Sequence, residues 1–359
     1  MALKVYEGHL AREIYGATIL VTVAFLTLFA FFDLINEFKD IGRGNYQFQH
    51  AFGYVLLTLP GRAYEILPIC VLIGTLYALT LLARNSEITV LRAAGLSTKE
   101  FLWSLMKVGS VFVVLTLLIG EAIAPPAERY AQQIRLQFLG AMIASEFRSG
   151  LWVKDDYSFV NVREVRPDAS LNGIRIYEFD QEFKLHSISE APHGVYLGNK
   201  LWRLTDVVRT VFERDSSRVE HDIELDWKSG LTPDVVSVLM VVPERMSLMT
   251  LMRYVNYLGG NQQKTERYEI ALWKKLVYPL ATLVMMVLAL PFAYMQDRMG
   301  SVSVRVFAGV MLGIGFHMLN GLLSSLGVIN NWLPFISAIT PSVMFLMAGA
   351  ALVWWVERR

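Results

Sequence analysis

Five basic residues lie within a few turns of the same ends of the first three long apolar segments of the chain. They are Lys39, Arg43, Arg62, Arg129 and Arg135. Such side chains can bind phosphates or carboxylates, and the planar guanidinium of arginine does so bidentately. For any one of them, the alternative is a long side chain that extends from a helix end to the membrane surface without a ligand. Large apolar side chains of the first segment accompany them: Phe25, Phe29, Phe31 and Phe32. Together the two groups suit an amphiphile with an anionic head and acyl tails.

A second candidate contact lies between the second and third apolar segments, in residues 84–97. Ser86 can cap a helix there, Glu87 favours the first turn, and Gly95 ends the helix. Its apolar face would be formed by Ile88, Leu91 and Ala94. A short helix with a carboxylate near its start can dock in a groove of another protein, and the alternative is an ordinary amphipathic surface helix.

No enzymatic site is visible in the sequence. The phosphate-binding loop pattern is absent, because the two Lys-Ser/Thr pairs, Lys228-Ser229 and Lys264-Thr265, lack the preceding glycine. There is no His-Glu-x-x-His pattern and no Cys/His spacing for a metal, and a single cysteine, Cys70, excludes a disulfide within the chain. We therefore expect this chain to bind no metal or cofactor. Any energy for uphill transport must come from a partner or an ion gradient.

Long stretches without charge decide the class of protein. Residues 14–32, 66–83, 276–296 and 306–356 contain no Asp, Glu, Lys or Arg, and the chain is 54% hydrophobic with a mean hydropathy of +0.41. Since a helix needs about 20 apolar residues to cross a bilayer, we predict six spans. They are at about 14–36, 55–82, 102–124, 272–295, 303–325 and 333–355, the third interrupted by Lys107. Residues 3–13 are expected to form a separate interfacial helix.

The segment between the third and fourth spans has a different character. Residues 174–179 and 223–227 alternate between apolar and polar, and residues 195–204 read as a hairpin with Gly198-Asn199 at its turn. These patterns predict an antiparallel β-sandwich or jelly roll. The predicted organisation is an N-terminal membrane half (1–137), a β-domain (138–245), and a connecting helix with a C-terminal membrane half (246–359). The distribution of Lys and Arg in the short loops predicts both termini in the cytoplasm and the β-domain outside.

With this layout the chain resembles a known family, the LptF/LptG permeases of the lipopolysaccharide-export ABC transporter. The resemblance extends over essentially the whole chain. It rests on Ser86-Glu87…Arg92-Ala-Ala-Gly95, Gly120-Glu121…Ala124-Pro125, Gly150-Leu-Trp-Val-Lys-Asp-Asp…Phe159-Val160, Leu201-Trp-Arg-Leu204, Trp227-Lys…Leu231-Thr-Pro-Asp234 and Trp273…Pro279-Leu.

The resemblance implies a function. In this family the permeases LptF and LptG pair on a dimer of the ATPase LptB, which binds ATP and Mg. Lipopolysaccharide enters from the outer leaflet of the bacterial inner membrane, passes to periplasmic β-jelly rolls, and continues along LptC and LptA toward the outer membrane. This chain would then be a multi-pass transporter subunit with no ATPase site of its own.

The resemblance also implies roles for individual residues. Residues 84–97 match the coupling helix that contacts the ATPase, through Glu87, Arg92 and Gly95. Lys39, Arg62 and Arg135 match basic residues at the rim of the lipid cavity. Asp33 and Gln132 stand where relatives carry a lysine and an arginine, so Arg43 and Arg129 are alternative headgroup contacts. The apolar lining would include Phe25, Phe29, Phe32, Phe316 and Leu319.

Three other classes remain alternatives. ABC permeases of the lipoprotein-release or mechanotransmission type usually have four spans, with the external domain after the first. A membrane receptor with a periplasmic sensing domain would normally carry a cytoplasmic signalling domain. A secondary transporter would need polar or broken helices in mid-membrane, for which His317 and Asn320 are the only support.

Overall fold

The computed structural model describes residues 5–146, 150–155, 157–165, 170–180, 182–213, 216–233, 243–261, 263–294 and 302–358. The chain divides into two compact units. The first, here called the helical unit, contains residues 1–33, 58–127 and 266–359; the second, the β unit, contains residues 34–57 and 128–265. The predicted domain limits at 137/138 and 245/246 stay predictions.

Within the described residues, six helical stretches are long and apolar enough to cross a membrane. They are α1 (Val5–Glu37), α2 (Phe48–Arg84), α4 (Thr98–Leu118) with its continuation, α8 (Glu266–Tyr294), α9 (Val302–Ile329) and α10 (Pro334–Glu357). Helix α4 continues through one turn of π-helix, η1 (Ile119–Ile123), into α5 (Ala124–Glu146). The prediction of three spans on either side of a β-domain is therefore confirmed.

The separate interfacial helix expected at residues 3–13 is wrong, because residues 5–13 are the first turns of α1. A polar contact with α4 fixes this end. Glu7 is buried and accepts hydrogen bonds from Lys107 Nζ at 2.8 Å and Ser104 Oγ at 2.9 Å. The hydroxyl groups of Tyr6 and Ser104 lie 2.8 Å apart. Lys107, which interrupts the third apolar segment, is therefore the ion-pair partner of a buried glutamate.

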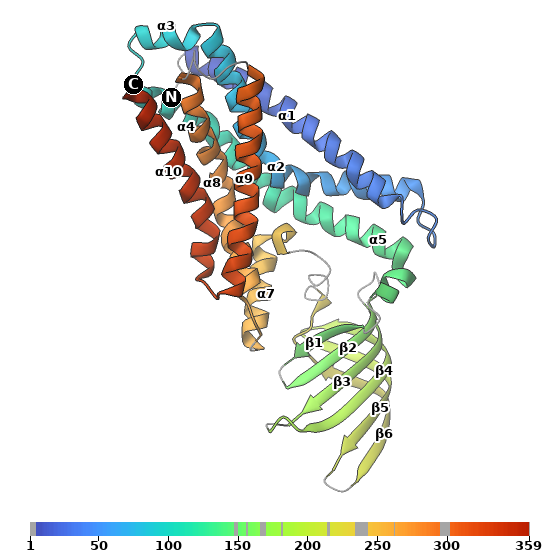
Figure 1. Ribbon diagram of the computed structural model, residues 1–359. Helices are drawn as coiled ribbons and strands as arrows, with labels where there is room; N and C mark the ends of the chain where they lie inside the picture. Colours follow the sequence, from blue (N-terminus) through green and yellow to red (C-terminus); the bar gives the residue numbers. More distant parts are fainter. Residues whose placement is uncertain are drawn as a thin grey trace. The chain divides into compact units, whose positions relative to one another are not determined.

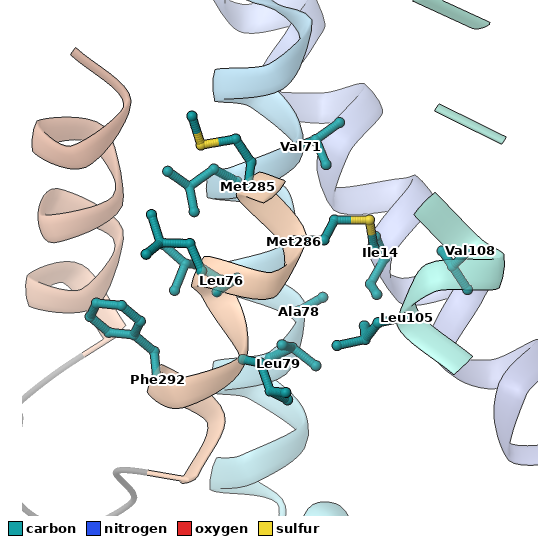
Figure 2. Packing of buried hydrophobic residues seen from close by; sticks show 14 of the residues in the cluster. Ile14, Val71, Leu76, Ala78, Leu79, Leu105, Val108, Met285, Met286 and Phe292 are labelled. Atoms are coloured by element: carbon teal, nitrogen blue, oxygen red, sulfur yellow. The ribbon is translucent and has the colours of Figure 1, made fainter. Parts of the chain in front are cut away.

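Helices α2 and α8 form the centre of the helical unit (Figure 1). The most apolar stretch of α2 is 83% buried and that of α8 is 67% buried, against 6% for α1. The shared core contains side chains from α1, α2, α4 and α8, among them Ile14, Val71, Leu76, Ala78, Leu79, Leu105, Val108, Met285, Met286 and Phe292 (Figure 2). A Cβ atom at Gly109 would lie 2.7 Å from Met286 Sδ, so α4 can approach α8 closely only because residue 109 is a glycine.

Six described strands form one antiparallel sheet in the β unit (Figure 1). They are β1 (Leu151–Asp155), β2 (Ser158–Val165), β3 (Leu171–Phe179), β4 (Leu185–Gly198), β5 (Leu201–Phe212) and β6 (Ser217–Lys228). Both alternating segments lie in strands, and the hairpin is confirmed, but its turn residues are Asn199 and Lys200, left-handed at φ 49° and 64°, one position later than the predicted Gly198-Asn199. Every described strand pairs with its sequence neighbours. The β-domain is therefore confirmed, while these six strands form a meander without the crossover connections that a jelly roll requires.

Candidate functional site

One candidate headgroup cluster lies where the turn between α1 and α2 meets α5, and we call it the Asp40 triad: Asp40 and Arg43 on the turn and Arg135 on α5. Arg43 Nη1 donates to Asp40 Oδ1 at 2.8 Å, and Arg135 Nη2 donates to Asp40 Oδ2 at 2.9 Å. The ring of Tyr54 lies 5.5 Å from the Arg135 guanidinium carbon. Two of the five predicted cations are therefore brought together on the two oxygens of one carboxylate.

A buried tyrosine fixes the base of this turn. Tyr46 is buried and donates its hydroxyl proton to Glu37 Oε2 at 2.9 Å, while Glu37 Oε1 lies 3.9 Å from Arg135 Nη2. Burial, followed by the hydrogen bond to Glu37, raises the pKa of Tyr46 well above its ordinary value. Gly44 has a φ of +57°, and a Cβ there would lie 2.9 Å from the Phe138 carbonyl oxygen. The turn is thus packed closely against α5.

The other two cations of the β unit have different surroundings. Arg129 is exposed and donates through Nη2 to Thr250 Oγ1 at 3.0 Å, in helix α7 (Leu248–Gly260). Lys39 is exposed and has no carboxylate partner within the described part of the chain. Gln132 donates to Glu128 at 3.1 Å.

Arg62 belongs to the helical unit. Its guanidinium donates to both oxygens of Asp33, at 2.9 and 3.0 Å, and Nη1 lies 3.5 Å from Glu65 Oε2. The ring of Phe29 lies 5.8 Å away. Asp33 therefore holds Arg62 in a bidentate ion pair.

The predicted apolar lining divides into two kinds of residue. On α1, Phe25 and Phe29 are partly exposed and stack with ring centroids 6.5 Å apart, and Phe32 is exposed. Leu319 on α9 is half-buried. In contrast, Phe316 is buried in the core and meets the ring of Phe345 edge-on at 5.2 Å. Its side chain packs inside the helix bundle, where it is not available to a lipid in this chain.

The short helix predicted near residues 84–97 is present as α3 (Glu87–Ala93). Ser86 precedes it but has a φ of 62° and makes no side-chain capping bond, so the expected serine cap is wrong. Gly95 ends the helix with a φ of +95°, and its N–H donates to the Arg92 carbonyl at 3.0 Å. Of the expected apolar face, Ile88 is buried in this chain and Ala94 is exposed.

Glu87 stands at the start of α3 with 39% of its side chain exposed. Its Oε2 lies 3.0 Å from His9 Nε2 on α1, and its Oε1 accepts from Asn85 at 3.4 Å. Arg92 is exposed and stacks on the Tyr294 ring at 4.9 Å. A cavity of ≈ 300 Å³ opens beside α3, and its walls include Tyr6, His9, Leu10, Leu82, Ile88 and Phe101. The helix thus presents a carboxylate and an arginine beside an apolar hollow.

One buried ion pair was missed by sequence reasoning. Lys275 on α8 is buried, and its Nζ lies 3.2 Å from Glu121 Oε1 on η1 and 5.8 Å from the centre of the Tyr64 ring. The signal available in the sequence was a pair of lysines, Lys274 and Lys275, just inside the fourth span, without any indication of the partner of Lys275.

Comparisons with known proteins identify the family of this chain. A sequence profile described as "Lipopolysaccharide export system permease LptF/LptG" matches residues 8–355. The chain belongs to the LptF/LptG permease family. It is 30% identical over 359 residues to the lipopolysaccharide export system permease protein LptG of Escherichia coli K12, covering 99% of this chain and 98% of that protein. It is 28% identical over 358 residues to LptG of Haemophilus influenzae, covering 99% of both.

Family membership answers the question of class. As an LptF/LptG permease with LptG-named relatives, the chain is an LptG-type permease subunit of the lipopolysaccharide export system, and with six apolar helices it is a multi-pass protein of the inner membrane. The lipoprotein-release permease, the receptor and the secondary transporter are therefore rejected.

In this LptF/LptG permease, three of the motifs that carried the resemblance meet at one place in the β unit, which we call the β-clasp. Asp155 at the end of β1 is buried and accepts from the Ser229 hydroxyl and from the Gly230 N–H, the latter at 3.1 and 3.2 Å. Trp202 on β5 is fully buried and donates Nε1–H to the Leu231 carbonyl at 2.6 Å. The motifs around residues 150–160, 201–204 and 227–234 thus share one hydrogen-bonded structure, with Asp156 and Asp234 outside the described residues.

Proposed function

We propose that this permease pairs with LptF on a dimer of the ATPase LptB, which binds ATP and Mg, and lifts lipopolysaccharide from the outer leaflet of the inner membrane. The lipid then passes to the β-domain in the periplasm and on to LptC and LptA. Both termini lie in the cytoplasm. In this proposal residues 1–137 and 246–359 form the gate, and residues 138–245 receive the lipid. The chain itself contributes no nucleotide site.

The observation that carries the proposal is the position of Glu87. Helix α3 follows directly on the central helix α2, and its first carboxylate contacts His9 near the N-terminal end of α1. The coupling helix therefore lies on the same side of the helical unit as that end of α1. Ile88, buried beneath it, fastens α3 to the core. A force applied to Glu87 and Arg92 by a docked ATPase would be passed directly to α1 and α2.

Energetics support an external motor. Extracting a many-tailed lipid exposes acyl chains, and each CH₂ group moved out of the membrane interior costs about 0.8 kcal/mol. No passive binding site offsets that loss. Since the sequence contains no phosphate-binding loop, nucleotide energy would have to enter through a partner.

The substrate end of the proposal rests on charge and apolar surface. Phosphates of the lipid would be bound by Lys39, Arg62 and Arg135, with Arg43 and Arg129 as further contacts. Helix α1 supports this role, because its apolar face is largely uncovered in the chain and carries Phe25, Phe29 and Phe32. Acyl chains have such a surface available on α1, whereas α2 is buried.

The decisive experiment is Glu87→Ala in the complex isolated from membranes in mild detergent. We expect the ATPase to be lost from the preparation, or its hydrolysis to proceed without lipid release, because the carboxylate on the docking face is gone. Glu13→Ala, an acidic-to-alanine change on α1, serves as the matched control and should leave both measurements unchanged. Retention of the ATPase together with normal lipid release in Glu87→Ala would refute the coupling role.

A further inference from the structure

The Asp40 triad has a geometry that the proposed function does not use. One carboxylate stands between two guanidinium groups, and each of its oxygens accepts from a different arginine, at 2.8 and 2.9 Å. Arg43 and Arg135 are 55% and 33% exposed, whereas Asp40 is 18% exposed. A phosphate group, with several acceptor oxygens and up to two charges, can make the same contacts and additional ones.

We propose that Asp40 is a placeholder for the lipid phosphate: it keeps Arg43 and Arg135 paired when no lipid is bound and gives them up when a phosphorylated headgroup arrives. This inference rests on the proposed role of the basic rim. It adds Asp40 as a specificity-determining residue, which sets how strongly an anion must bind in order to capture the two arginines.

The neighbouring acid is built differently, and this difference identifies Asp40 as the exchangeable partner. Glu37 is buried, accepts the Tyr46 hydroxyl proton at 2.9 Å and stays 3.9 Å from Arg135. Asp40 lies three residues further along, beyond the end of α1, where the chain turns. Glu37 therefore belongs to the fixed base of the turn, while Asp40 pairs with arginines that solvent reaches.

Arg135 also has donor capacity to spare. A guanidinium group carries five N–H donors, and Arg135 uses Nη2 for Asp40, while its buried Nε has no hydrogen-bond partner. A phosphate that replaced the Asp40 carboxylate could engage the unused donors of Arg135 as well as those of Arg43. Because exposed ion pairs contribute little net stability, little free energy is lost when Arg43 and Arg135 leave Asp40. Their additional hydrogen bonds to a phosphate therefore favour the exchange.

The test is Asp40→Asn in the purified permease complex, with binding of bisphosphorylated lipid A measured in detergent. We expect about three- to tenfold tighter binding, because the arginines no longer have a competing carboxylate. Dephosphorylated lipid A should show no gain. Inorganic phosphate at millimolar concentration should not compete, because it lacks the acyl chains; equal competition would indicate a site for free anions and overturn the proposal.

Two controls separate exchange from general electrostatics. Asp222→Asn removes the same charge from an exposed position on β6 and should leave binding unchanged. In an Arg43→Gln/Arg135→Gln background, Asp40→Asn should no longer tighten binding; a gain that persists there contradicts the exchange. Asp40→Glu keeps the carboxylate and should bind as the unmodified complex does. A thermal unfolding midpoint equal to that of the unmodified complex shows that Asp40→Asn has folded.

Failure of the inference and failure of the proposed function give different results. If the Arg43→Gln/Arg135→Gln complex binds bisphosphorylated lipid A as well as the unmodified complex does, these arginines are not headgroup ligands and the rim assignment fails with the placeholder. If that complex binds more weakly but Asp40→Asn brings no gain, only the placeholder role of Asp40 is wrong.

Discussion

Trp202 and Asp155 hold the β-clasp through side-chain hydrogen bonds in a buried setting. Replacing Trp202 by Phe keeps an aromatic ring but leaves the Leu231 carbonyl without its indole donor. An unpaired buried carbonyl costs about 1–3 kcal/mol, so we expect loss of stability of that size in the β unit. Hydrogen exchange of residues 201–204 and 229–231 in the purified protein measures it. Trp152→Phe, at an exposed tryptophan, is the control and should have a smaller effect.

The Arg203–Asp226 ion pair between β5 and β6 leads to a prediction about how the stability of this strand pairing depends on pH. The hydrogen bond from Arg203 to Asp226, at 3.0 Å, lowers the pKa of the Asp226 carboxyl below its ordinary value of 3.8. Because the folded pKa is the lower one, the pair stabilises the strand pairing above the unfolded pKa and loses this contribution as the pH falls through the folded value. Chemical-shift titration of Asp226 should therefore give a pKa that rises toward the ordinary value in Arg203→Gln. An unchanged Asp226 pKa in that variant would contradict the assignment.

At the level of residues, sequence reasoning found charges but not most of their partners. Arg62 was singled out as a candidate headgroup contact, and the structure pairs it with Asp33 and Glu65. Glu7 and Lys107 are a hundred positions apart in the chain, and so their contact depends on how two helices pack. Periodicity and composition report on one helix at a time, so such pairs were out of reach.

Among the helices, the α4–η1–α5 rod is interrupted by a turn of π-helix that carries Glu121. Such bulges widen the helix by one residue and occur frequently at functional sites. Here the bulge brings Glu121 to the buried Lys275, and Gly120 lies directly against the Tyr64 ring, where a Cβ would come within 2.6 Å. The ion pair thus joins this rod to the central helix α8 at the point where its hydrogen-bond pattern changes.

Replacing one member of this ion pair should destabilise the protein more than replacing both members. Lys275→Met leaves Glu121 without its buried partner, and such changes cost about 3–5 kcal/mol, whereas replacing both members by apolar residues is often nearly neutral. We therefore expect Lys275→Met to lower the thermal unfolding midpoint in detergent more than Lys275→Met/Glu121→Leu does. Equal losses in the single and double variants would show that the two charges do not depend on each other.

The elements themselves were largely readable from the sequence. Apolar runs with few or no charges located all six spans, and period-two alternation located β-strands, because both signals are local. The predictions that were wrong concerned residues whose conformation depends on contacts with other parts of the chain. Ser86 does not cap α3 because its own backbone is left-handed, and the N-terminal segment continues α1 because Glu7 is buried against α4. The order in which the strands pair was also not readable from alternation; the six described strands each pair with their sequence neighbours.

For the molecule as a whole, the single cysteine offers a direct test of orientation. Cys70 is fully buried, so a membrane-impermeant maleimide should not label the unmodified protein in intact cells. Val90→Cys on α3 and Ile223→Cys on β6 replace exposed side chains, 65% and 83% accessible. With α3 in the cytoplasm and the β-domain in the periplasm, the reagent applied once the outer membrane is made permeable should label only Ile223→Cys. Labelling of Val90→Cys before the inner membrane is opened would reverse the proposed topology.

The central position of α2 has a consequence for how the protein is made. Helix α2 ends at Arg84, but α8, which covers its core side chains, begins only at Glu266 (Figure 2). At about 5–20 residues per second, a ribosome needs on the order of ten seconds or more to synthesise the intervening chain. Throughout that interval α2 can pack against α1 and α4, but the part of its core that α8 covers has no permanent neighbour. An insertase or chaperone that shields newly inserted helices can therefore act throughout this interval. The interval ends only when Met285 and Met286 have left the translocon.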